Sequence, residues 1–218
     1  MSASSPSPAL PDVTLSDFLA RAQTRLHEQL PSQPLANQPR AGDDRFWARP
    51  LSSDMLAKAR DAAVLIPVIG HQDNPTILLT QRSRNLAKHS GQIAFPGGKI
   101  DQDETALQAA LREAEEEIGL AAHKIEPLGY LDYYFTGTGF RIAPVVALVT
   151  PGFEIKINPA EVDDVFEVPL AFLMEPGNHQ RIQRGDEGHS FLAMPYAERF
   201  IWGATAGMLR QLYERLYP

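Results

Sequence analysis

Apolar residues recur at three- and four-residue spacing in three stretches of the chain, which is the period of an amphipathic helix. One stretch covers 14–30, with Ser16 as a candidate cap. The second covers 103–118, and the third covers 199–217 at the C-terminus. The pattern therefore predicts three helices, two of them near the ends of the chain.

Short apolar runs bounded by turn residues lie between these helices and predict strands. The runs cover 62–70, 76–82, 125–135, 140–149, 162–170 and 190–196. The first two are separated by the turn-like sequence HQDNP. Strands together with well-separated helices favour an α/β fold in layers, with a mixed sheet.

Two proline-rich segments divide the chain. The first residues, MSASSPSPALPDV, form a polar lead-in, and 31–50 resembles a connector. We therefore expect 1–55 to be an N-terminal extension with one helix, and 56–218 to be the main domain. The role of the extension's helix is open, since it could pack on its own domain or on a second subunit of a homodimer.

Composition narrows the classes of function. The chain has 218 residues, 44% hydrophobic and 22% charged, which is typical of a globular protein. Its formal net charge of -7 argues against nucleic-acid binding through a broad positive field. An anionic small molecule would need local Arg or Lys residues, or a bound cation.

The sequence contains no cysteine, which excludes disulfides, thiolate catalysis and cysteine-based zinc sites. The first residues lack the basic and apolar regions of a signal peptide, and no apolar run has membrane-spanning length. We therefore expect a cytoplasmic protein without a membrane partner.

The helix predicted over 103–118 carries carboxylates where its own dipole disfavours them. Asp103 is its candidate N-cap, and Gly119 is its candidate stop. The core-facing arc contains Leu107, Ala110, Leu111, Ala114 and Ile118. A second arc contains Glu113, Glu116 and Glu117, whereas Glu115 points elsewhere. Each carboxylate in the last turn costs about 0.3–1 kcal/mol.

A bound divalent cation would reverse this cost, because Mg²⁺ prefers oxygen ligands and leaves positions for water and phosphate. The simpler alternative is a solvated acidic face. The run of glutamates alone does not decide between the two.

The spacing around these glutamates resembles the Nudix box, G-x5-E-x7-R-E-U-x-E-E-x-G-U, in which U is apolar. The defined positions are occupied by Gly98, Glu104, Arg112, Glu113, Ala114, Glu116, Glu117, Gly119 and Leu120. Upstream, LLTQRSRNLAKHSGQIAFPGG (78–98) is similar to the signature of the coenzyme A pyrophosphatase branch. One position departs from that signature, because Ala87 stands where the branch has Arg.

The resemblance implies a Nudix α/β/α sandwich with a mixed sheet. It also implies that Glu113, Glu116 and Glu117 bind Mg²⁺ or Mn²⁺, with the Gly97 carbonyl as a further ligand. Glu116 would take part in catalysis, and Arg112 would orient the glutamates. The alternative for Arg112 is an ordinary surface pair with Glu116.

The box does not identify a general base. Our candidate is Glu161 in NPAEVDDVF, a position at which Nudix enzymes often supply a loop carboxylate. Asp163 and Asp164 are rivals, and all three could also be solvated loop charges.

Positive and aromatic residues next to the box are candidates for substrate binding. They are Arg82, Arg84, Lys88, His89 and Phe95. The cations could meet the 3'-phosphate or diphosphate of a CoA-like ligand. The aromatic residues 133–135 could flank a base or a pantetheine arm, although strand aromatics more often pack in a core.

The leading hypothesis is a metal-dependent pyrophosphatase that converts CoA or acyl-CoA into 3',5'-ADP and (acyl-)4'-phosphopantetheine. A second hypothesis keeps the reaction and changes the substrate to ADP-ribose, NADH or a dinucleoside polyphosphate. A third is a non-catalytic Nudix module for ligand sensing, but no box glutamate is missing. Ala87 bears on the substrate more than on the reaction.

Overall fold

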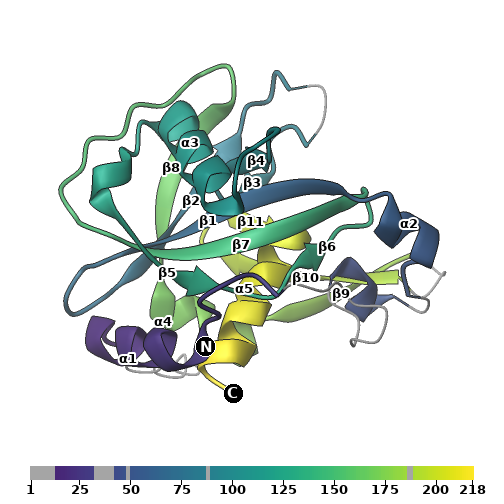
Figure 1. Ribbon diagram of the computed structural model, residues 1–218. Helices are drawn as coiled ribbons and strands as arrows, with labels where there is room; N and C mark the ends of the chain where they lie inside the picture. The colour runs from purple at the N-terminus through teal and green to yellow at the C-terminus, as the bar shows by residue number, and fades with distance from the viewer. Residues whose placement is uncertain (1–12, 32–41, 48–49, 87–88, 186–188) are drawn as a thin grey trace.

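A mixed sheet lies between helices in the computed structural model, which describes residues 13–31, 42–47, 50–86, 89–185 and 189–218 (Figure 1). Its eight strands are β1 (Arg60–Ile69), β2 (Thr76–Arg82), β3 (Ile93–Ala94), β4 (Gly97–Lys99), β5 (Ile125–Tyr130), β6 (Tyr134–Phe135), β7 (Phe140–Val149) and β8 (Val162–Pro169). The main path runs β3-β2-β1-β7-β5, with β4 also paired to β1, β6 to β7 and β8 to β2. The α/β class with a mixed sheet is therefore confirmed.

The centre of the sheet is the parallel pair β1 and β7, which runs from Arg60 opposite Phe140 to Ile69 opposite Val149. The other pairings in this sheet are antiparallel. Helices cover both faces of β1, which explains its nearly continuous apolar sequence.

Alternate residues of β1 belong to two separate cores. Ala63 and Leu65 face the core beneath α3 (Ala106–Ile118), whereas Ile66 and Val68 face the core with α1 (Leu15–Arg25) and α5 (Ala204–Leu216). Figure 1 shows α3 on one side of the sheet and α1 and α5 on the other. This is the α/β/α arrangement that the sequence resemblance implied.

Helix α3 begins later than expected. Thr105 is its N-cap and forms a capping box with Gln108, whereas Asp103 lies outside the helix with a positive φ of 68°. The expected stop is confirmed, because Gly119 adopts the left-handed conformation with φ 69°.

The N-terminal helix α1 packs on the main core. Its cap is Thr14 and not Ser16, since the Thr14 side chain accepts a hydrogen bond from the Asp17 backbone. Phe18 is fully buried in the core shared with α5. Arg21 also donates to the Leu216 carbonyl at the end of α5 (3.1 Å).

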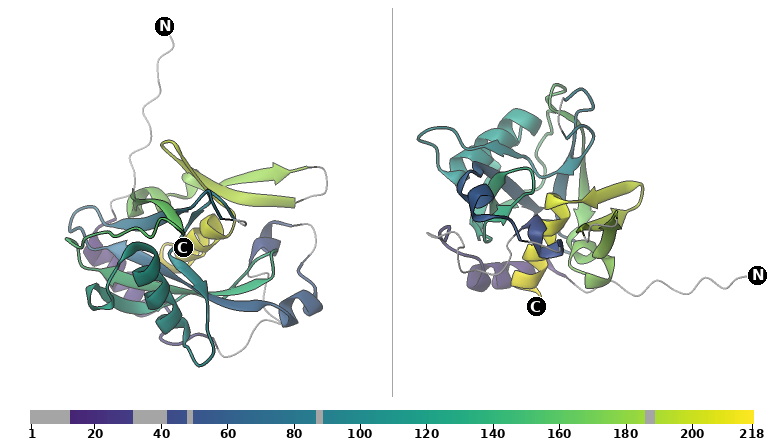
Figure 2. Two further views of the ribbon diagram at one scale, coloured as in Figure 1. Left: turned by 90° about the horizontal axis from the view of Figure 1, so that it is seen from above. Right: turned by 90° about the vertical axis from the view of Figure 1, so that its right-hand side faces the viewer.

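The C-terminal helix predicted over 199–217 is shorter than expected, because β11 (Arg199–Trp202) precedes α5. Gly203, with φ 66°, turns the chain between them. Strand β11 belongs to a second, antiparallel sheet with β9 (Gln180–Arg184) and β10 (His189–Tyr196), which projects from the main body in Figure 2.

The predicted strand over 125–135 divides into β5 and β6. Two short helices were not predicted, α2 (Ser53–Ala57) and α4 (Leu170–Leu173), and neither was the 3₁₀ turn Asp43–Phe46. Among the described helices, none is both long enough and apolar enough to cross a bilayer.

Candidate active site

Three carboxylates from distant parts of the chain meet beside β4. Glu113 and Glu117 come from α3, and Glu161 comes from the loop before β8. One ligand oxygen from each lies within 4.8 Å of the others. We call Glu113, Glu117 and Glu161 the carboxylate cluster. Like charges at such spacing repel unless protons or a cation offset them.

Glu117 is the most deeply buried member, with a side chain 2% exposed. Its Oε2 is buried without a hydrogen-bond partner among the described residues, and Arg82 Nη1 lies 3.6 Å from Oε1. Burial raises the pKa of Glu117 to about 8, and the Arg82 charge opposes part of this rise. A buried oxygen with a vacant lone pair is suited to a cation ligand.

Glycines in β4 allow α3 and β1 to approach this strand closely. A Cβ on Gly98 would lie 2.2 Å from Glu113 Oε1, so a larger residue would displace that carboxylate. A Cβ on Gly97 would lie 2.4 Å from the Ala63 carbonyl, and Gly97 has φ 159°. A hydrogen bond from the Gly97 backbone also lowers the Glu117 pKa. Gly97, the expected carbonyl ligand, therefore borders the cluster.

Arg112 joins α3 to β4 and to the loop between them. Its Nε and Nη2 donate to both oxygens of Glu104 (2.9 and 3.0 Å), and Nη2 donates to the Lys99 carbonyl (3.1 Å). Its Nη1 donates to Glu113 Oε1 (2.9 Å) and Glu116 Oε2 (3.2 Å). Glu104 and Glu113 raise the pKa of Arg112, and the hydrogen bond with Glu104 is the largest cause. Arg112 thus fixes the orientation of Glu113.

Glu116 lies at the edge of this arrangement. Its side chain is 54% exposed and pairs with Arg112. Helical spacing grouped Glu116 with Glu113 and Glu117. In the structure, the third member of the carboxylate cluster is Glu161. The roles of Glu116 as a ligand and in catalysis stay predictions.

The three acidic residues of the loop differ in their contacts. Glu161 accepts from Asn158 Nδ2 (3.2 Å), and its carbonyl accepts from the Ser83 backbone (2.8 Å). Asp163 instead accepts from the Arg84 backbone (3.0 Å), and Asp164 pairs with Arg199. Of the three, Glu161 is the one in the carboxylate cluster.

A cleft of about 730 Å³ opens beside the cluster. Of the expected substrate residues, Arg82, His89 and Phe95 line it, whereas Arg84 does not. Lys88 and Ala87 lie outside the described residues. His89 is held by a hydrogen bond with Gln92 (2.8 Å).

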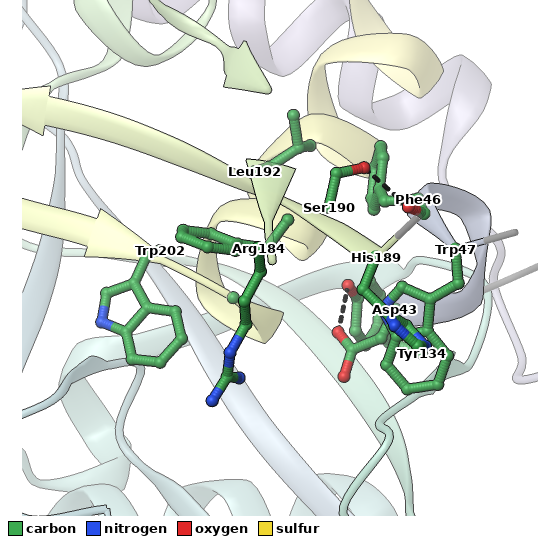
Figure 3. Close-up of a pocket in the computed structure, with 11 residues that line it drawn as sticks. Asp43, Phe46, Trp47, Tyr134, Arg184, His189, Ser190, Leu192 and Trp202 are labelled. Atoms are coloured by element: carbon green, nitrogen blue, oxygen red, sulfur yellow. Dashed lines mark hydrogen bonds between the residues drawn. The ribbon is translucent and has the colours of Figure 1, made fainter. Parts of the chain in front are cut away.

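Residues that were not among the expected substrate residues also line the cleft. They include Asp43, Trp47, Arg184 and Trp202, which line a second pocket as well (Figure 3). These four residues come from three distant segments, so no single local motif could bring them together. Tyr134, one of the aromatics expected to flank a ligand, is buried and donates to Asp43 at the wall of this second pocket.

The chain resembles known proteins over most of its length. A family model described as "NUDIX domain" matches residues 59–185. An "Uncharacterized Nudix hydrolase NudL" from Shigella flexneri serotype 5b (strain 8401) is 38% identical over 204 residues, covering 92% of this chain and 93% of that protein. The protein with the same description from Escherichia coli (strain K12) is 41% identical over 168 residues, covering 75% and 86%.

A solved structure resembles the fold. It is the crystal structure of a Nudix hydrolase, RenU, from M. smegmatis, with a TM-score of 0.50 and 20% sequence identity. The match covers 72% of this chain and 84% of that chain.

Proposed function

Because this chain belongs to the Nudix hydrolase family, we propose that it hydrolyses the diphosphate of CoA or acyl-CoA, releasing 3',5'-ADP and (acyl-)4'-phosphopantetheine. The carboxylate cluster beside the cleft is the observation that carries the reaction class. The similarity of 78–98 to the coenzyme A pyrophosphatase signature supports the choice of substrate.

The cluster fits a divalent cation, Mg²⁺ or Mn²⁺. Glu113 and Glu117 would hold it through carboxylate oxygens, and the buried Oε2 of Glu117, which has no hydrogen-bond partner among the described residues, is suited to that role. When bound, such a cation neutralises diphosphate charge and lowers the pKa of the attacking water. Glu116 and the Gly97 carbonyl are further proposed ligands at the edge of the cluster.

The chain's own residues would bind and orient the substrate. Arg82 and His89 line the cleft next to the cluster and would contact the diphosphate. Arg112 would hold Glu113 in place through its contacts with Glu104. Glu161 would accept the proton of the attacking water. Because Glu161 lies within the carboxylate cluster, the competing assignment is that it binds the metal ion.

A substrate panel tests the proposal. Purified protein with Mg²⁺ or Mn²⁺ is incubated with CoA, acetyl-CoA, ADP-ribose, NADH and diadenosine polyphosphates, and kcat/KM is compared. We expect CoA or acetyl-CoA to give the highest value. A strong preference for ADP-ribose would overturn the assignment of CoA as the substrate but would agree with the reaction class. No turnover on any compound would overturn both the substrate and the reaction class.

A further inference from the structure

A pocket of about 300 Å³ opens off the cleft that borders the carboxylate cluster. The two cavities adjoin, because they share five lining residues: Asp43, Trp47, Arg184, Trp202 and Gly203. We call the smaller cavity the tryptophan pocket. Its volume is at the lower end of the range of about 300–1,000 Å³ that is typical of small-molecule sites.

The two tryptophans of the sequence both line this pocket, although they are far apart in the chain. Trp202 ends β11, and Trp47 follows the 3₁₀ turn Asp43–Phe46. Figure 3 shows the side chain of Arg184 between them. Indole rings offer large flat faces on which a heterocyclic base can stack.

Trp47 is held in place by its neighbours. Asp43 accepts from the Tyr134 hydroxyl (2.9 Å) and from the Gly137 backbone (2.8 Å), which fixes the turn before Trp47. A Cβ on Gly137 would lie 2.3 Å from Trp47 Cη2, so the indole packs directly on this glycine. Asp43 is therefore a positioning residue for the pocket wall.

Arg184 supplies the positive charge of the pocket. It is exposed at the end of β9, and no carboxylate of the described part of the chain forms an ion pair with it. A guanidinium matches phosphate with two parallel hydrogen bonds.

We infer that the tryptophan pocket binds the nucleoside half of the substrate, with the base against Trp47 or Trp202 and the 3'-phosphate of that half at Arg184. This inference rests on the proposed function. The other half, a flexible pantetheine arm, has no ring to stack on the indole faces. The pocket thus selects for a ring that carries its own phosphate.

Tryptophan fluorescence tests the inference without turnover. Protein in EDTA is titrated with 3',5'-ADP, 5'-AMP and 4'-phosphopantetheine. We expect saturable quenching by 3',5'-ADP, affinity at least about tenfold weaker for 5'-AMP, and no quenching by 4'-phosphopantetheine. Absence of quenching by 3',5'-ADP, or equal quenching by 4'-phosphopantetheine, would overturn the inference.

Variants identify the contacts. Arg184→Ala should remove the preference for 3',5'-ADP over 5'-AMP, and Arg184→Lys should keep part of it. Lys58→Ala is the matched control, because it removes one exposed positive charge that pairs with Asp54. Gly137→Ala, which displaces Trp47, should weaken binding of 3',5'-ADP. An unchanged preference in Arg184→Ala contradicts the assignment of the phosphate.

The binding and turnover experiments can fail separately. Binding of 3',5'-ADP without hydrolysis of CoA would overturn the proposed function and leave the tryptophan pocket as a nucleotide site. Hydrolysis of CoA without quenching by 3',5'-ADP would support the function and overturn the pocket assignment.

Discussion

Glu117 is an ionisable carboxylate with almost no contact with solvent, and this makes the stability of the protein depend on pH. Its raised pKa, about 8, means that the metal-free folded state holds a proton that the unfolded chain has already released. The resulting stabilisation is present below the ordinary carboxyl pKa and is lost as pH rises through about 8.

Metal binding should reverse this trend, because a cation requires the deprotonated carboxylate. We expect Mn²⁺ to raise Tm more at about pH 9 than at about pH 6, measured by thermal unfolding against EDTA controls. Glu117→Gln should flatten the pH dependence, whereas Glu115→Gln, on an exposed residue of the same helix, should not. A Tm increase that does not depend on pH would contradict this assignment.

Glu104 should raise the affinity for the metal ion without binding the ion itself, because it accepts two hydrogen bonds from Arg112 and so holds that side chain in place. We expect Glu104→Gln to weaken Mn²⁺ binding about 10–100-fold in calorimetric titrations. Asp101→Asn is the control, since Asp101 is exposed and lies 3.9 Å from Arg112. Equal effects of the two substitutions would show a general charge effect instead of a positioning role.

The competing roles of Glu161 can be separated by kinetics. A general base predicts that Glu161→Gln lowers kcat about 10²–10⁴-fold even when metal is saturating. A ligand role predicts a higher metal requirement that saturating Mn²⁺ overcomes. Asp163→Asn, which alters a backbone contact of Arg84, should leave kcat near the wild-type value. Near wild-type kcat for Glu161→Gln at saturating metal would exclude the base assignment.

Helical spacing could place Glu113 and Glu117 on one face, because that geometry is local. It could not show that the Glu117 side chain is buried or that Glu161 lies beside it. Both depend on contacts between distant segments, such as the Ser83 backbone hydrogen bond to Glu161.

The close packing of α5 on β6 depends on Gly207. A Cβ there would lie 2.1 Å from the Tyr134 hydroxyl, which is buried. We expect Gly207→Ala to lower the free energy of unfolding by about 1–3 kcal/mol in urea titrations, despite the better helix propensity of alanine. In the double variant, Tyr134→Phe removes the hydroxyl and should recover part of the free energy lost in Gly207→Ala. If the effects of the two substitutions on the free energy of unfolding are strictly additive, the proposed steric clash is wrong.

The missed elements have identifiable causes. Arg199–Trp202 continues the apolar pattern of α5, so helical periodicity predicts one element over both, whereas the turn at Gly203, with φ 66°, separates them. Strand β9 is polar and mostly exposed, so it gave no apolar run. By contrast, β1, β2 and β7 were predicted well because burial on the sheet leaves long apolar sequences.

Helix α1 joins the N-terminal segment to the main core. The division into 1–55 and 56–218 stays a proposal, and Phe18 gives a test of it. Phe18→Ala should cost about 3–5 kcal/mol and keep a single unfolding transition, if the helix is part of one cooperative unit. Ser16→Ala, on the exposed side of the helix, should change little. Two separate transitions in urea would show that the extension unfolds on its own.

The parallel pairing of β1 with β7 also sets an order of assembly. Arg60 cannot pair until Phe140 has been synthesised and has reached it. The intervening chain, which includes β4 and α3, forms the loop that this pairing closes. Contacts so distant in sequence slow folding. On a ribosome, the glutamates of α3 emerge well before the strand that completes the sheet beneath them. Refolding kinetics should therefore show enzymatic activity returning no earlier than the slow phase that closes the centre of the sheet.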